Sequence, residues 1–299
     1  MKKKEFLHKD RIIKGITTDG HFKISVIKTT DVVRSAQRRH HLSLLNTVLL
    51  GRALTGVMLL ASNLKAEERV QLRIEGSGPI GMLIAEATSH GEIRGYVSNS
   101  TAELDYTQTQ DLGEGFGAGI LTFSKVLYNE AQPITGTVEL IKGNVTEDIA
   151  YYLLQSEQIA SAISLDVGID EHGNVEQAGG VFIQAMPNAP DMMKDKLEEN
   201  VRNMPVLNTL FKQDVYIDDL LQRLSQPYEV KELDRFPVHF FCRCNKARFK
   251  SALAMVNIEE LKDMDDQSQE LVCHYCNEQY VITKEEIQKI IQDAQVRHN

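Results

Sequence analysis

The four cysteines of this sequence lie close together, between residues 242 and 276, and none occurs in the 241 residues before them. They form two pairs, Cys242-x-Cys244 and Cys273-x-x-Cys276, with 28 residues between the pairs. Two thiolates on one short loop can approach a single ion, and tetrahedral Zn²⁺ accepts two such pairs. A unit of about 60 residues has only a marginal apolar core, which a metal ion can staple. The spacing therefore predicts one Zn²⁺ per chain, bound by these four cysteines.

The clustering of the cysteines also indicates their compartment. In a reducing cytoplasm, cysteines gathered in this way are typical of metal or redox chemistry and not of structural disulfides. His239 and His274 lie near the cysteines in the sequence, and imidazole nitrogens also bind zinc. Since four cysteines already fill a tetrahedral site, we expect neither histidine to be a ligand.

The length and charge of the chain limit what it can be. Its 299 residues favour two or three structural units. Its formal net charge of −9 argues against a general nucleic-acid-binding protein, because binding to phosphates requires a basic surface. We therefore expect no nucleic-acid partner.

Two segments have some features of a targeting signal or a membrane span. The start of the chain, Met1–Phe6, carries three lysines, but no apolar stretch follows it, so we expect no secretory signal. The most hydrophobic stretch, Leu42–Leu60, contains Asn46, Arg52 and two glycines. Such a stretch is typical of a buried helix and not of a membrane span. We expect a cytoplasmic protein without a membrane partner.

The elements that position the cysteines begin with a core of mixed structure. Strand-like segments follow one another in hairpin-like succession, separated by turns rich in glycine and serine. Few helices intervene, so the pattern predicts an α+β core with antiparallel sheets. The predicted strands are 70–74, 82–85, 93–97, 120–123, 135–141, 162–167 and 180–185, and predicted helices occupy much of 30–60 and 146–159.

The remaining short motifs give no evidence of catalysis. A G-x-G-x-x-G pattern occurs at Gly76–Gly81, but the residues after it predict a strand, whereas a dinucleotide site requires a helix there. We interpret the pattern as a hairpin turn. The chain contains no P-loop, H-E-x-x-H or G-x-S-x-G motif. We therefore predict no catalytic residue and no enzymatic activity.

The segment after the core is predicted to be a helical linker. Pro187 and Pro190 mark a boundary, and apolar residues then recur at helical spacing over 191–225. Four methionines lie at this junction, and flexible methionine-rich surfaces can suit binding to many partners. The predicted organisation is an α+β core domain (1–187), a helical linker (188–230) and a small C-terminal zinc-binding domain with four cysteine ligands (231–299).

Charge is distributed unevenly within the last unit. A basic block, residues 235–250, contains five lysine or arginine residues and no acid. An acidic block, residues 259–270, contains six acids and one lysine. We expect the two blocks to face each other across the metal.

Several separated motifs of this chain together resemble one family over nearly the full length. They are Phe241-Cys-Arg-Cys244, Cys273-His-Tyr-Cys276 with Tyr280, Gly76-Ser-Gly-Pro79, Ser156-Glu-Gln158, and Gly179-Gly180 with Gln184-Ala-Met-Pro187. The family is the redox-regulated chaperone called the heat-shock protein of 33 kilodaltons, and the mass of 33.7 kDa agrees with it. The cysteine array is the most specific of these motifs. One departure is Asn245-Lys-Ala-Arg248, where many relatives carry Ser-x-Glu-Arg.

The resemblance implies a protein of the oxidative stress response that assists protein folding. It would be an ATP-independent holdase, which binds unfolding client proteins and prevents their aggregation. The reduced, zinc-bound form would be inactive. Oxidation would form the disulfides Cys242–Cys244 and Cys273–Cys276 at this redox-active centre, release zinc, and unfold the zinc domain and the linker. The active form would tend to be a homodimer.

The surface that binds clients can be narrowed to a hypothesis. The linker helices would lose their packing partner when the zinc domain unfolds, and their apolar side chains would then be exposed. The residues expected to bind clients are Met193, Leu197, Val201 and Phe211.

Two other functions agree with part of the sequence. A zinc-ribbon nucleic-acid-binding protein would use the basic block, although the rest of the chain is acidic. A thiol–disulfide oxidoreductase would use Cys273-x-x-Cys276, although no βαβ setting surrounds this motif and the second cysteine pair would be unexplained.

Overall fold

The computed structural model describes residues 9–264 and 267–298, and the chain divides between Phe241 and Cys242 into two units. The predicted α+β class with antiparallel sheets is confirmed. The boundary predicted between residues 230 and 231 differs from this division. Residues 231–241 belong to the first unit because they pair with strands of its two sheets.

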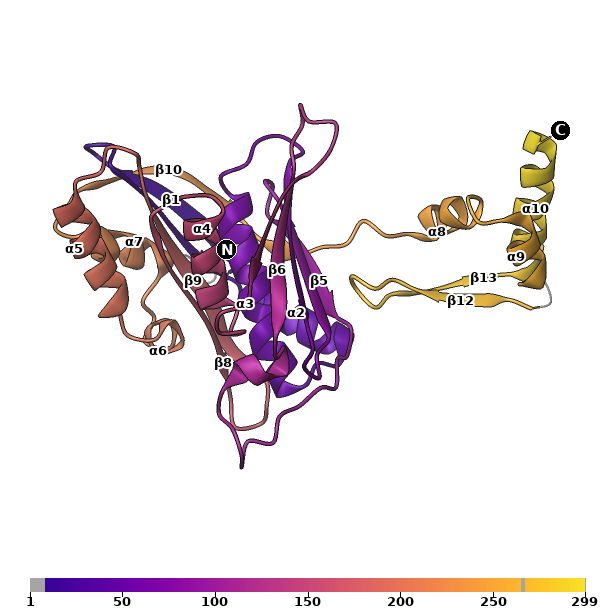
Figure 1. The fold of residues 1–299 in the computed structure, drawn as a ribbon, viewed down its shortest axis with the longest axis horizontal. Helices are drawn as coiled ribbons and strands as arrows, with labels where there is room; N and C mark the ends of the chain where they lie inside the picture. Colours follow the sequence, from indigo (N-terminus) through magenta and orange to yellow (C-terminus); the bar gives the residue numbers. More distant parts are fainter. Residues whose placement is uncertain (1–8, 265–266, 299) are drawn as a thin grey trace. The chain divides into compact units, whose positions relative to one another are not determined.

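The first sheet has five strands, and every neighbouring pair is antiparallel (Figure 1). The two strands that come first in the sequence, β1 (Arg11–Thr17) and β2 (Phe22–Lys28), form a hairpin whose turn contains Gly20 at φ 78°, a conformation that favours glycine. The strands in spatial order are β10 (Val230–Pro237), β1, β2, β9 (Val175–Ala185) and β8 (Ser161–Ile169). We refer to this sheet as the first sheet.

The second sheet has six strands and is antiparallel except for its short outermost strand, which runs parallel to its neighbour. The glycine pattern at Gly76–Gly81 lies in the hairpin between two of these strands, which confirms the interpretation as a turn. The strands in spatial order are β11 (His239–Phe240), β5 (Glu92–Val97), β4 (Met82–Thr88), β3 (Arg69–Gly76), β6 (Gly119–Val126) and β7 (Ile134–Glu139).

Helix α3 (Leu44–Ala61) lies between the two sheets and contacts strands of both. Among the residues that the structure describes, it is the one helix long and apolar enough to cross a membrane, and 78% of that window is buried inside the protein. The prediction of a buried helix is therefore confirmed. The helix fits because of its glycines: a Cβ atom on Gly56 would lie 2.6 Å from Ile149.

Helix α2 (Thr30–His40) precedes α3 and ends in the basic run of the sequence. His41 ends the helix in the left-handed conformation, at φ 50°. Ser43 then caps α3 by accepting a hydrogen bond from the backbone N–H of Asn46 at 3.2 Å. The basic run thus marks a helix junction.

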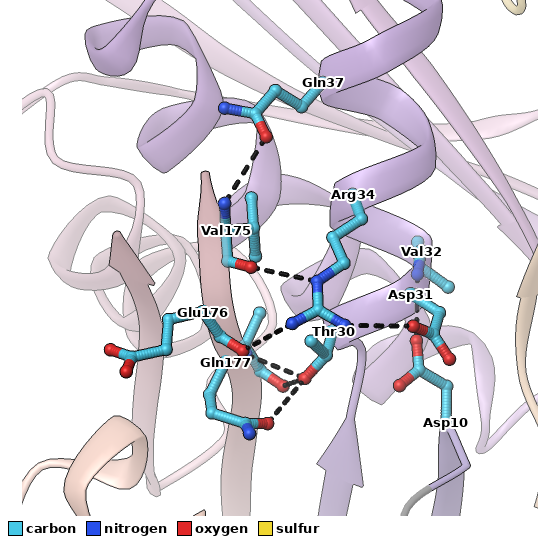
Figure 2. Close-up of polar contacts among 10 residues, drawn as sticks. Asp10, Thr30, Asp31, Val32, Arg34, Gln37, Val175, Glu176 and Gln177 are labelled. Carbon is cyan, nitrogen blue, oxygen red and sulfur yellow. Dashed lines mark hydrogen bonds and ion pairs between the residues drawn. The ribbon is translucent and has the colours of Figure 1, made fainter. Parts of the chain in front are cut away.

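Side chains of α2 fasten it to the start of β9 (Figure 2). The Arg34 guanidinium donates hydrogen bonds to the carbonyl oxygens of Val175 and Glu176, both at 2.9 Å. Gln37 accepts from the Val175 N–H at 3.4 Å, and the Thr30 hydroxyl accepts from a backbone N–H of β9. These contacts join residues more than 130 positions apart, so they fix the helix between the sheets.

Asp10 caps α2 from outside the helix and is almost completely buried. Its Oδ2 accepts a hydrogen bond from the Val32 N–H at 2.8 Å (Figure 2). Burial raises the pKa of Asp10 to about 7, and the negative charge of Asp31 adds to this effect, while the Val32 N–H and the Lys28 ammonium oppose it. The carboxyl group is therefore held near its neutral form in the folded protein.

The raised pKa of Asp10 makes stability depend on pH. The folded protein keeps the proton up to about pH 7, whereas the unfolded chain loses it near 3.8. The stabilisation is therefore complete below pH 3.8 and is lost as pH rises through 7. Relative to Asp10→Asn, the wild-type protein is expected to lose up to about 1.4 kcal/mol per pH unit over this window. Urea unfolding of the reduced proteins at pH 5 and pH 7.5, followed by circular dichroism, measures the difference.

Asp170→Asn is a control whose effect should be the same at pH 5 and pH 7.5. The backbone N–H of Asn174 lowers the pKa of the exposed Asp170 carboxyl below its usual 3.8, so its contribution to stability is lost only as pH falls below this window. An Asp10→Asn effect that is the same at both pH values would contradict the interpretation.

Helix α4 (Thr146–Gln155) packs beside β8 and confirms the helix predicted to start near residue 146, although it ends at Gln155 and not near residue 159. The buried carboxylate of Asp148 accepts four backbone N–H groups from the loop that leads into the helix. Such bonds hold the loop against the helix start, where backbone donors would otherwise be unpaired.

Three linker helices cover the face of the first sheet opposite α3: α5 (Asp191–Arg202), α6 (Leu207–Lys212) and α7 (Ile217–Ser225). The prediction of helices over 191–225 is confirmed. Within their own unit, the packing partner of these helices is the first sheet. Their common apolar cluster contains Phe22, Ile24, Val26, Val181, Ile183, Met193, Leu197, Leu207, Leu210, Phe211, Ile217, Leu220, Leu221 and Leu224.

The second unit contains a two-stranded hairpin and three helices among its described residues. Its apolar cluster is small: six buried residues, Leu253, Leu261, Ile282, Ile287, Ile290 and Ile291. The elements are α8 (Lys246–Leu253), α9 (Ile258–Asp263), β12 (Gln269–Val272), β13 (Gln279–Ile282) and α10 (Lys284–His298).

Candidate metal centre

The first cysteine pair lies in the segment that leads into α8. Cys242 and Cys244 are half-buried there. The next residue, Asn245, caps the helix by accepting a hydrogen bond from the Arg248 N–H at 2.9 Å. Asparagine is a preferred capping residue, as serine is, so the departure at this position preserves the local structure.

The second pair lies in the turn that joins β12 to β13. The Cys273 carbonyl oxygen accepts hydrogen bonds from the N–H groups of Cys276, at 3.3 Å, and Asn277, at 2.7 Å. Asn277 has φ 57°, which asparagine tolerates better than most residues. The Cys273 N–H donates to the Glu278 carbonyl at 2.9 Å. This tight turn directs both buried thiols to the same side.

The structure brings all four sulfur atoms within 4.8 Å of one another. Two of the separations join one pair to the other: 3.7 Å between the Sγ atoms of Cys242 and Cys273, and 3.3 Å between those of Cys244 and Cys276. Zinc–sulfur bonds of about 2.3 Å imply tetrahedral sulfur atoms about 3.8 Å apart. The four thiols therefore fit a single zinc ion. All four are in the thiol form in this structure and not in disulfides.

Neither histidine considered from the sequence belongs to this group. Among residues 9–264 and 267–298, the set of side chains that could hold a metal ion consists of the four cysteines. That His239 and His274 are not ligands stays a prediction.

The charge state of the site depends on its burial. Burial raises the pKa of the Cys273 thiol and that of the Cys276 thiol, so both favour the protonated form in the absence of a cation. The Tyr280 hydroxyl lies 3.3 Å from the Cys244 Sγ, and this contact raises the pKa of the tyrosine. A bound divalent cation reverses this preference, because it is held by thiolates.

Lysines of the basic block pair with an acid that the sequence analysis did not identify. Lys246 and Lys250 place their Nζ atoms 2.7 and 2.9 Å from the Glu286 carboxylate on α10. The Lys246 ammonium, with further hydrogen bonds, lowers the pKa of Glu286 to about 2. Glu286 lies outside the acidic block, so the partner that the structure shows for these two lysines is not a member of that block. Asp265 and Asp266 of that block lie outside the described residues.

The residues expected to bind clients lie in the first unit and not at the metal centre. Met193, Leu197 and Phe211 are buried, and Val201 is half-buried, all in the cluster between the linker helices and the first sheet. In this structure they are covered.

Comparison with known proteins places these features in a family. The family model described as Hsp33 protein matches residues 10–283. The 33 kDa chaperonin of Thermus thermophilus is 40% identical over 301 residues, which cover 96% of this chain and 87% of that protein. The 33 kDa chaperonin of Desulforamulus reducens is 35% identical over 286 residues, covering 94% of this chain and 97% of that protein.

A solved structure agrees with these similarities. The crystal structure of the 33 kDa chaperonin, or heat shock protein 33 homolog, of Thermotoga maritima matches this one with a TM-score of 0.89 and 34% sequence identity. The match covers 97% of this chain and 100% of that chain. Sequence and fold are thus shared over nearly the whole length, and the chain belongs to the Hsp33 chaperone family.

Proposed function

We propose that this protein is a redox-regulated, ATP-independent holdase of the cytoplasm that protects unfolding proteins during oxidative stress. The observation that carries the proposal is the meeting of four thiols at one point in a unit whose own apolar cluster has six buried residues. Membership of the Hsp33 family supports the chaperone class. The protein acts by binding and needs no catalytic residue.

In the reduced protein, Cys242, Cys244, Cys273 and Cys276 would hold one Zn²⁺ as thiolates. These cysteines would thereby join the segment before α8 to the β12–β13 turn through the bound ion. Structural zinc sites contribute about 10–16 kcal/mol in small zinc-binding peptides, which is folding free energy for such a unit. The second unit is therefore expected to be folded only while the four sulfurs remain reduced.

Oxidation would remove the ligands by pairing them. Each disulfide forms as two thiols give two electrons and two protons to one peroxide molecule, which becomes two water molecules. We assign the pairs Cys242–Cys244 and Cys273–Cys276, since each joins cysteines of one short loop. With both disulfides formed, no thiolate remains to bind zinc, and the second unit would lose the metal crosslink that stabilises it.

The consequence for the first unit follows from the short linker helices. They have 12, 6 and 9 residues, and helices of such length are not stable in water without a packed face. The chain between them and Cys242 consists of β10 and β11 with their connections. Release of this segment would destabilise the helices and expose Met193, Leu197, Val201 and Phe211 to clients. Exposed apolar surface would also favour a homodimer of the active form.

The test follows three quantities together as oxidant is added to the reduced, zinc-loaded protein. Hydrogen peroxide with mild heat, or hypochlorous acid, is expected to release one zinc per chain as four thiols disappear. Aggregation of an unfolding client should be suppressed over the same range of oxidant dose, and reductant with zinc should reverse the change. If the oxidised, zinc-free protein leaves client aggregation unchanged, the proposed function is wrong.

A further inference from the structure

The edge of the first sheet is formed by β10, the strand that joins the linker helices to the metal-binding unit. It pairs antiparallel with β1 from Val230 opposite Thr17 to Pro237 opposite Arg11, and the register shifts once, at Leu233, which lies between the partners of Lys14 and Gly15. β10 is an edge strand of this sheet (Figure 1), so among the described residues β1 is the one strand that pairs with it.

Little side-chain packing holds β10 in this position. The five side chains from Lys231 to Arg235 are exposed, and the apolar packing comes from two half-buried residues near the ends of the strand, Val230 and Phe236, each against one of the two apolar clusters. Two ion pairs add to the attachment, Lys14–Asp234 at 3.4 Å and Arg235–Asp218 at 2.8 Å, both with partly exposed partners. Surface pairs of this kind contribute at most about 1 kcal/mol each. The strand is therefore held mainly by backbone hydrogen bonds, which any extended polypeptide can make.

The neighbouring strand β1 is fixed in a different way. It is paired with β2 on its other side, and Ile12 and Ile13 are buried in the two apolar clusters on opposite faces of the sheet. Loss of β10 would therefore leave β1 in place with a row of unpaired N–H and C=O groups. Such an edge is a template for pairing with another chain.

We propose that β1 is a strand-acceptor site: after β10 is released, an extended segment of an unfolding client pairs antiparallel with β1 in its place. The present occupant shows what fits, which is eight residues of extended backbone with side chains that mostly face solvent. Recognition through the backbone places few demands on sequence, as a holdase requires. This inference rests on the proposed function and adds how a client is held.

Hydrogen exchange of the full chain tests the site, read at the amides of β1 in three states. In the reduced, zinc-loaded protein the amides are expected to be protected. In the oxidised protein, the β1 amides that were hydrogen-bonded to β10 should exchange quickly. They are about half of the β1 amides, because alternate residues of a strand bond to the neighbours on opposite sides. Addition of an unfolding client such as heat-denatured luciferase should restore their protection. Strand β7, an edge strand of the second sheet, is the internal control, and the exchange of its amides should be the same in all three states.

Each other outcome overturns the inference. If the β1 amides stay protected after oxidation, either β10 has not left or a strand of a second copy of the chain has replaced it. Dilution distinguishes the two cases, because only pairing with a second copy depends on protein concentration. If they stay exposed when the client is bound, or if β7 is protected instead, clients bind elsewhere. Client aggregation is measured on the same samples, so a failure of the holdase itself appears as lost protection in solution, whatever the exchange of β1.

Discussion

Replacing Cys276 by serine is expected to unfold residues 242–299 in the reduced protein. Cys276 is buried, and its Sγ lies 3.3 Å from that of Cys244. Loss of one ligand removes much of the roughly 10–16 kcal/mol that a structural zinc site provides. A cluster of six buried residues cannot replace it. Zinc content should fall from one per chain towards zero, and the unit should become sensitive to limited proteolysis.

The same variant separates the metal site from the chemistry of oxidation. If the folded unit is what keeps the chaperone inactive, Cys276→Ser should suppress client aggregation under reducing conditions, without oxidant. His274→Ala is the matched control, because this exposed residue lies in the same turn and outside the ligand set. It should keep zinc, fold and the need for oxidant. A folded Cys276→Ser protein with full zinc content would contradict the ligand assignment.

Replacing Leu197 by alanine is expected to loosen the linker helices from the first sheet. Leu197 on α5 is 1% exposed and lies in the apolar cluster shared with β2 and β9. Truncation of a buried leucine costs about 2–5 kcal/mol, through lost burial and the cavity that remains. The variant should therefore reach half of its own maximal client protection at a lower oxidant dose or at a lower temperature than the wild-type protein, with zinc release unchanged. Because Leu197 is also proposed to contact clients, this threshold is the readout and not the maximal protection.

Met192→Ala provides the comparison for Leu197→Ala. Met192 lies on the same helix but is 80% exposed, so its truncation should change stability by less than about 0.5 kcal/mol. Proteolysis of the linker helices and client aggregation, each measured against oxidant dose, give the result. Equal thresholds for the two variants would mean that the packing of α5 does not control activation.

The parts of the fold that the sequence predicted are those with a local signal. Strands 70–74 and 82–85 and the helices of 191–225 follow from apolar residues at periods of 2 and 3.6. The hairpin β1–β2 was missed, although Asp19-Gly20 between two runs rich in isoleucine and valine is a turn signal that could have identified it.

Strand β10 had no such signal. Five consecutive side chains are exposed, so no alternation of apolar and polar residues marks it, and Pro237 favoured a boundary instead. Its pairing with β1 joins residues more than 200 positions apart. Only the tertiary structure could show that this segment completes the first sheet and not the zinc-binding unit.

The metal centre also has some features that the sequence predicts and others that it does not. The four cysteines and their two loops could be predicted from the sequence, because ligands that share an ion must be brought close by short spacing within each pair. The contacts between the Sγ atoms of Cys242 and Cys273 and of Cys244 and Cys276, and the ion pairs of Lys246 and Lys250 with Glu286, appear only in the folded structure. The tertiary structure also decided that the linker helices cover the first sheet. These contacts join distant segments, and their geometry depends on the packing of whole elements, which no local pattern records.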